Sequence, residues 1–229
     1  MRGPIHMLRM RLSASSFVIS GILFVLYPTI RPFSDETSLQ GTAAFASIDW
    51  LVAHILAIVA FTLLPLGLLG LHNSLQEKAV NSLMYWAVVL CLIGIGLTLP
   101  FYGGETFGLH AIGQEAIRQQ TATLVSLSTV VRSGAGLVMF LVGLLLLSIA
   151  AIILAIAIWR SGRYPKWSGI PFAIGMGLYI PQFFGGQPLR IAHGILIAIG
   201  CIWIAVGLWR QSNHNIEQQI QSTTFGSES

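Results

Sequence analysis

Six long stretches of this chain contain no charged side chain, and they constrain the fold more than any other feature. The stretches are residues 13–29, 50–76, 79–104, 133–159, 168–189 and 191–209, and they span 17 to 27 residues. An α-helix rises about 1.5 Å per residue, so about 20 residues cross the hydrocarbon core of a bilayer. Backbone amides find no water in that core, and a stretch that crosses it must therefore be helical.

The composition supports a membrane protein. Hydrophobic residues make up 55% of the chain and charged residues 9%, whereas soluble domains carry roughly 25% charged residues. We therefore expect an all-α polytopic membrane protein with six transmembrane helices, arranged as three helical hairpins. The predicted helices cover residues 13–28, 50–71, 83–100, 133–159, 169–184 and 191–209. Residues 1–210 form the transmembrane domain in this prediction, and the polar residues 211–229 form a disordered cytoplasmic tail.

The first predicted helix also has features of a secretory signal peptide. Arg2, Arg9 and Arg11 precede a short apolar run over residues 17–27. The small residues at 44–46, Ala-Phe-Ala, lie too far downstream of that run for a usual cleavage site. We therefore expect the first helix to be retained as a membrane span.

Basic side chains favour one orientation across the cell membrane. With the N-terminus in the cytoplasm, eight Lys and Arg residues lie on the inner side and four on the outer side. The positive-inside rule favours this topology, which places both termini in the cytoplasm. The inner residues are Arg2, Arg9, Arg11, Lys78, Arg160, Arg163, Lys166 and Arg210, and the outer residues are Arg31, Arg118, Arg132 and Arg190. Orientation thus explains the net charge of +4, and we expect no nucleic-acid partner.

One short phrase occurs twice, each time where an apolar stretch ends. Residues 93–106 read IGIGLTLPFYGGET, and residues 174–188 read IGMGLYIPQFFGGQP. With Gln182 taken as an insertion, residues 93–104 and 174–186 agree at eight of twelve paired positions. Both copies end helices that run from inside to outside, so the pattern indicates a duplicated helical hairpin.

The repeated glycines and prolines predict close packing and disturbed helix ends. Glycines at 94, 96, 175 and 177 let helix backbones approach closely in lipid. Proline lacks a backbone donor and disturbs the last helical turn, and freed backbone groups at that depth must be buried or face a cavity. Paired interruptions of this kind are a sequence indication of a binding site in repeat-built transporters. The alternative is two ordinary helix ends anchored at the interface by aromatic side chains.

Ionisable residues gather on the predicted outer side, and they define a candidate site. Ionisable groups at membrane depth are costly and are therefore candidates for function. The candidate residues are Asp49, His54, Glu105, His110, Arg132, Arg190 and His193.

The histidines among these residues allow several interpretations. His54, His110 and His193, with Glu105 or Asp49, are sufficient in number for a mononuclear metal site. His54 and His193 are alternatively candidates for axial haem ligands, or for an acid–base pair without a metal. The plain alternative is that the histidines hydrogen-bond between helices. The spacing selects no cofactor, because each histidine comes from a different segment.

We expect an accessory or structural membrane subunit with a small-molecule or metal site at the outer leaflet. The alternatives are a small transporter-like subunit and a membrane-embedded enzyme that depends on a metal or haem bound by the outer histidines. The expected partners are the lipid bilayer and either further copies of the chain or another membrane subunit. The chain contains no phosphate-binding loop with lysine and no Gly-x-Ser-x-Gly motif, which disfavours an ATPase and a serine hydrolase.

Overall fold

The computed structural model describes residues 4–75 and 77–226, and every regular element in these ranges is a helix. The all-α prediction is therefore confirmed for this part of the chain. The α-helices are α1 (Pro4–Ile30), α2 (Leu39–Ala46), α3 (Ile48–Ser74), α4 (Lys78–Gly103), α5 (Leu109–Gln119), α6 (Leu127–Val131), α7 (Gly134–Ser161), α8 (Ile170–Gly177) and α9 (Gln187–Gly226). Three short elements complete the set, namely a π-helix η1 (Gly104–Gly108) and the 3-10 helices η2 (Thr123–Ser126) and η3 (Pro181–Phe184).

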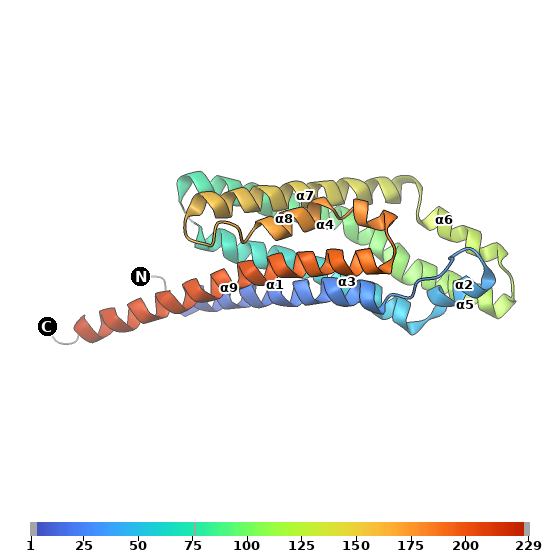
Figure 1. The fold of residues 1–229 in the computed structure, drawn as a ribbon, viewed down its shortest axis with the longest axis horizontal. Helices are drawn as coiled ribbons and strands as arrows, with labels where there is room; N and C mark the ends of the chain where they lie inside the picture. Colours follow the sequence, from blue (N-terminus) through green and yellow to red (C-terminus); the bar gives the residue numbers. More distant parts are fainter. Residues whose placement is uncertain (1–3, 76, 227–229) are drawn as a thin grey trace.

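Five helical segments are long and apolar enough to cross a membrane. They are Met7–Ile30, Ile48–Ser74, Val80–Gln119, Gly134–Ser161 and Gln187–His214. Helix α1 packs against α3 and α9, and α4 packs against α7. The bundle is elongated, and the start of α1 and the last turns of α9 lie at the same end of it (Figure 1). We call this end the terminal end.

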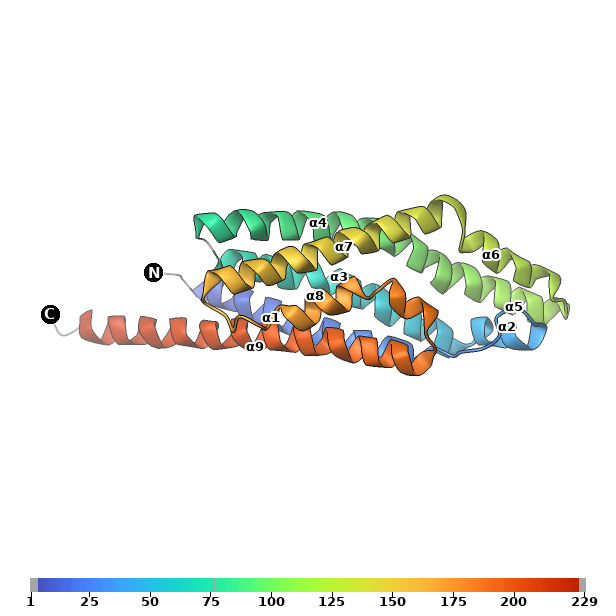
Figure 2. The same cartoon turned by 45° about the horizontal axis from the view of Figure 1, so that its top comes forward.

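The predicted helix over residues 169–184 does not form as one helix. Helix α8 ends at Gly177, a turn follows, and η3 begins at Pro181. This broken segment runs the length of the bundle between α7 and α9 (Figures 1 and 2). The first copy of the repeated phrase behaves differently, because Pro100 lies inside α4, which continues directly into η1. Similar sequences thus give a continuous helix in one place and a broken one in the other.

Donors from neighbouring helices satisfy the backbone carbonyls that the break releases. The Tyr179 N–H donates to Met176 O, three residues back, and so leaves the Gly175 carbonyl without its α-helical donor. His193 Nε2 donates to Gly175 O at 2.7 Å, and the Ser148 hydroxyl donates to Met176 O at 2.7 Å. The irregular backbone is therefore hydrogen-bonded within the protein, as membrane depth requires.

Two of the four glycines of the repeat lie in close helix contacts. A Cβ at Gly94 would lie 2.8 Å from the Gly143 carbonyl oxygen of α7, and a Cβ at Gly175 would lie 2.6 Å from Ile197 of α9. A Cβ at Gly96 or Gly177 would meet nothing within 4 Å. Close packing thus accounts for one glycine in each copy.

A small helical cap covers the end of the bundle opposite the terminal end. It consists of α2, η1, η2, α5 and α6, with a core of Phe45, Trp50 and Leu109. The Trp50 indole N–H donates to the Glu105 carbonyl at 2.8 Å, and His110 Nδ1 donates to Phe45 O at 2.9 Å. These two bonds join α3 to η1 and α5 to α2.

The structure continues α9 as a helix to Gly226, into the segment that the sequence predicts to be disordered. An established helix can propagate through polar residues that could not nucleate one. Residues 227–229 of the predicted tail lie outside the described residues.

Two neighbouring glycines of α4 give a matched test of the α4–α7 contact. Gly96→Ala raises the unfolding temperature, because alanine favours a helix over glycine by about 1 kcal/mol and the site has open space. Gly94→Ala lowers it, because the new methyl group meets the Gly143 carbonyl. Thermal unfolding of both variants in detergent measures the difference, and equal shifts would contradict this packing.

Candidate functional site

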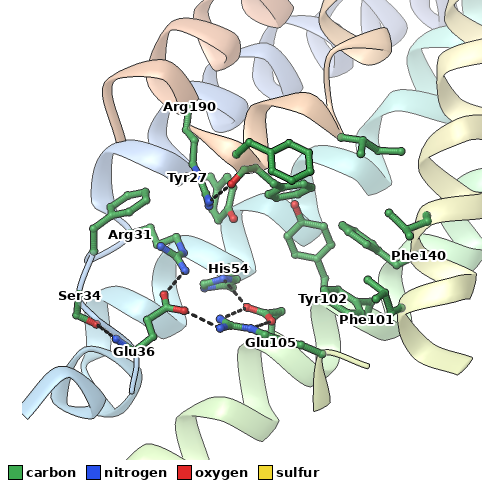
Figure 3. A pocket seen from close by; sticks show the side chains of 17 residues that line it. Tyr27, Arg31, Ser34, Glu36, His54, Phe101, Tyr102, Glu105, Phe140 and Arg190 are labelled. Carbon is green, nitrogen blue, oxygen red and sulfur yellow. Dashed lines mark hydrogen bonds and ion pairs between the residues drawn. The ribbon is translucent and has the colours of Figure 1, made fainter. Parts of the chain in front are cut away.

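A pocket of about 500 Å³ lies between the cap and the helical bundle (Figure 3). Helices α1, α3, α4 and α7, together with η1, η3, the start of α9 and the segment after α1, contribute to its lining. Its polar and tyrosine residues are Tyr27, Arg31, Ser34, Glu36, His54, Tyr102, Glu105, Arg132 and Arg190. Its apolar residues are Phe33, Phe101, Leu137, Phe140, Leu141, Ile180, Phe183 and Phe184. We call it the end pocket.

Arg132 is the centre of an ion-pair network in the end pocket. Its Nη1 lies 2.6 Å from Glu36 Oε2, and its Nε and Nη2 lie 2.5 and 3.0 Å from the two carboxylate oxygens of Glu105. Arg31 pairs with the other oxygen of Glu36 at 2.6 Å. Glu105 Oε2 in turn lies 3.8 Å from His54 Nε2. The network therefore joins the segment after α1, η1, α3 and the residue before α7.

The network keeps its outer members charged. Burial raises the pKa of the Glu36 carboxyl, but the guanidinium groups of Arg132 and Arg31 outweigh burial and hold that pKa below 4.5. Burial likewise lowers the pKa of Arg132, and hydrogen bonds to Glu105 with the charge of Glu36 raise it above its usual value. Both groups are thus ionised at neutral pH.

The π-helix η1 positions the Glu105 side chain. It forms the wide turn between α4 and α5, and turns of this type are frequent at functional sites. The Glu105 carbonyl accepts the Trp50 indole N–H, so α3 holds this turn in place. His54 Nδ1 donates to the Trp50 carbonyl at 2.8 Å, and its Nε2 faces Glu105 Oε2 at 3.8 Å.

Tyrosine hydroxyls form the inner end of the pocket. The Tyr27 and Tyr102 rings pack edge-on with their centroids 6.2 Å apart, and the Tyr102 and Tyr179 hydroxyls lie 2.9 Å apart, within hydrogen-bond distance. The Tyr27 ring packs edge-on against the His54 ring at 5.4 Å. The three phenols are buried, so their hydroxyls are shielded from solvent beneath the charged residues.

Arg190 is bonded in a different way from the other two arginines of the pocket. Its Nε donates to Gly185 O at 3.2 Å and its Nη2 to Phe183 O at 3.0 Å. Its guanidinium also lies 5.4 Å from the rings of Phe33 and Phe183. Among the described residues no carboxylate forms an ion pair with it, and backbone carbonyls and aromatic rings make its direct contacts.

The structure brings together four of the seven candidate residues named from the sequence. His54, Glu105, Arg132 and Arg190 all line the end pocket, although they come from four distant segments (Figure 3). Three do not line it: Asp49, His110 and His193. Asp49 is exposed in the first turn of α3, where its charge favours the helix N-terminus.

The three histidines do not form the metal site considered from the sequence. His54 bonds the Trp50 carbonyl, His110 the Phe45 carbonyl and His193 the Gly175 carbonyl. In residues 4–75 and 77–226, no three His, Cys, Asp or Glu side chains lie in a group suited to a metal ion. Of the two haem-ligand candidates, only His54 lines the pocket, and the His193 ring packs against Tyr179 at 5.1 Å.

Sequence reasoning missed Arg31 and Glu36, which are essential to the network. Both lie in the connection after the first helix, where the sequence pattern singled out only Arg31, as one of the outer basic residues. Arg31 is 6% exposed, because its guanidinium lies 4.5 Å from the Trp50 ring and pairs with Glu36. The available signal was an Arg and a Glu five residues apart beside a predicted membrane surface.

Comparisons with known proteins give no relative. No family model matches the chain, no curated protein matches it, and no solved structure matches its fold. The geometry of the end pocket is therefore the basis for a functional proposal.

Replacing Arg132 tests the network against an ordinary surface pair. Arg132→Gln lowers the free energy of unfolding by about 2 kcal/mol or more, because two largely buried carboxylates lose their counter-charge. The matched control is Arg118→Gln, whose partner Glu115 lies on the exposed face of α5, and it leaves the unfolding temperature nearly unchanged. Thermal unfolding in detergent compares the two, and equal effects would contradict a central role for Arg132.

The lowered pKa of Glu36 predicts acid sensitivity. A carboxyl whose pKa is lower in the folded chain stabilises the fold above its unfolded pKa, and this contribution is lost as the pH falls through the folded pKa. Wild type is therefore more stable than Glu36→Gln at neutral pH, and the difference shrinks as the pH falls below 4.5. Unfolding curves between pH 3 and 7 measure it, and a difference that stays constant with pH would be inconsistent with this pairing.

Proposed function

We propose that this chain is a multi-pass protein of the cell membrane whose end pocket binds a small amphiphilic anion. Five apolar helices of membrane length support the membrane location. Residues of α8 and η3 run along the bundle beside the five long helices, as a sixth pass would (Figure 1). An even number of passes is consistent with the start of α1 and the end of α9 lying at the same end of the bundle. Binding without a reaction fits the accessory role expected from the sequence.

We further propose that the terminal end faces the cytoplasm. Arg9, Arg11, Arg160, Arg163 and Arg210 gather at this end of α1, α7 and α9, as the positive-inside rule requires. The end pocket then lies at the outer leaflet. Three antiparallel pairs, α1 with α3, α4 with α7, and α8 with α9, support an origin in a duplicated hairpin.

The charge balance of the end pocket favours an anionic ligand. Arg31, Arg132 and Arg190 supply three positive charges, and Glu36 and Glu105 supply two negative ones. The ion pairs use Arg31 and Arg132, so the excess charge resides on Arg190. A carboxylate or phosphate that pairs with Arg190 would complete the balance with charge-assisted hydrogen bonds. Arg190 without a carboxylate partner is the observation that carries the proposal.

The rest of the lining favours an apolar group on the same ligand. Side chains of α7 and η3 form an apolar wall of the pocket, and Phe140 of this wall is labelled in Figure 3. Leu141 and Phe184 in this wall are 37% and 92% exposed, so it continues onto the lipid-facing surface. The volume of about 500 Å³ suits a small molecule. A ligand with an acidic head and a short apolar chain fits both halves.

Two probes of equal chain length and opposite charge test this proposal. Octyl phosphate and octyltrimethylammonium are titrated calorimetrically into the full chain in phosphatidylcholine nanodiscs, with empty nanodiscs subtracted. We expect wild type to bind the anion at least tenfold more tightly than the cation. Arg190→Gln removes about tenfold of anion affinity, the value of a charged hydrogen bond.

Two controls separate charge from structure. Arg190→Lys keeps the charge and retains the preference for the anion, whereas Arg118→Gln, outside the pocket, leaves the affinity unchanged. Unfolding temperatures confirm that each variant is folded. Equal binding of the two probes by wild type, or full anion affinity in folded Arg190→Gln, would refute the proposal.

A further inference from the structure

A second cavity lies on the outward face of the bundle, far from the end pocket. It is a groove of about 350 Å³ between α1 and α9, near the terminal end. Its lining residues are Ala14, Ser15, Val18, Ile19, Ala205, Val206 and Trp209. Three of these side chains are small, and they leave a channel between the two helices. The side chains that flank it are exposed, with Ile19 at 47% and Val206 at 41%.

Arg11 lies at the terminal end of this groove, one turn before Ala14 and Ser15. Its guanidinium lies 5.6 Å from the Trp209 ring, and its Nη2 donates to Asn213 Oδ1 at 3.2 Å. Its Nε is buried and has no hydrogen-bond partner in the structure. In the part of the chain that the structure describes, no carboxylate pairs with Arg11. The groove is therefore apolar along its length, and the Arg11 guanidinium lies at its terminal end beside the Trp209 ring.

We propose that this groove binds one anionic phospholipid, with an acyl chain between α1 and α9 and the phosphate at Arg11. The acyl chain of a lipid would cover the apolar side chains that line the groove. The phosphate would supply an acceptor and a counter-charge for the Arg11 guanidinium. Trp209 lies between the two parts, where an indole ring suits the boundary of hydrocarbon and headgroups. The site rests on the membrane location proposed above, but not on the ligand of the end pocket.

The charge around the groove selects an anionic over a zwitterionic headgroup. Arg210 follows Trp209 in α9, and it is exposed, as are Arg160 and Arg163 at the same end of the bundle. Basic pockets between helices on the cytoplasmic side are typical sites for acidic headgroups, and the cytoplasmic leaflet carries acidic lipids. A trimethylammonium headgroup would bring a positive charge into this cluster. The site thus distinguishes phosphatidylglycerol from phosphatidylcholine.

Native mass spectrometry of the full chain in a neutral detergent tests the site. Dioleoyl phosphatidylglycerol and dioleoyl phosphatidylcholine are titrated separately, and bound lipids are counted. We expect one phosphatidylglycerol to bind about fivefold more tightly than phosphatidylcholine, the effect of about one basic side chain near a headgroup. Arg11→Gln abolishes this preference. Arg160→Gln, which removes an equal charge at the same end but outside the groove, preserves it.

Two further arms test the acyl-chain part of the site. Ser15→Leu fills the groove with apolar atoms and weakens both lipids about equally, while Arg11→Lys keeps the preference for phosphatidylglycerol. Glycerol 3-phosphate, a soluble molecule that has the headgroup phosphate but no acyl chain, fails to displace the bound lipid. Equal binding of both lipids by wild type, equal effects of Arg11→Gln and Arg160→Gln, or displacement by glycerol 3-phosphate would overturn the proposal. Arg190→Gln, which changes the end pocket and not the groove, still binds the lipid. A wrong proposal for the end pocket is therefore distinguished from a wrong proposal for the groove.

Discussion

The guanidinium of Arg132 joins parts of the chain that no continuous helix connects. It binds Glu36 in the segment after α1 and Glu105 in η1, and it stands immediately before α7. Buried ion pairs add little net stability, but a carboxylate that loses its partner at such a position is strongly destabilising. The network therefore contributes more to the choice of which segments pack together than to the free energy of unfolding. The end pocket forms where these segments meet around one cation.

Much of the architecture could be predicted from hydropathy, because the cost of unpaired backbone in lipid acts on every residue alike. The uncharged stretches correspond to the five long helices and to the broken pass over 169–184. The repeated prolines predict a disturbed helix end in both copies, but the structure breaks the helix only before Pro181 and continues it through Pro100. The difference comes from neighbours: His193 and Ser148 offer donors to the released carbonyls beside α8. Hydropathy contains no information about donors on another helix.

The candidate site could be predicted only in part. His54, Glu105, Arg132 and Arg190 were placed on one side by topology, and the fold brings them to one pocket. His193 was placed on that side too, but it faces α8. Topology gives the depth of a residue, whereas the rotation of a helix decides whether its side chain faces a cavity. Arg31 was missed because burial of a charge in a connecting segment depends on a ring and a carboxylate from elsewhere.

In the six-pass arrangement proposed above, the broken segment over residues 169–184 would also restrict the order in which the chain enters a membrane. The carbonyls of Gly175 and Phe183 find their donors on α9. If residues 169–184 left the translocation channel alone, these groups would face hydrocarbon at a cost of several kcal/mol each. In that arrangement the segment would stay beside α7 until α9 has been synthesised. The last two passes would then enter together, and a chain that ends before His193 would lack the donor for the Gly175 carbonyl.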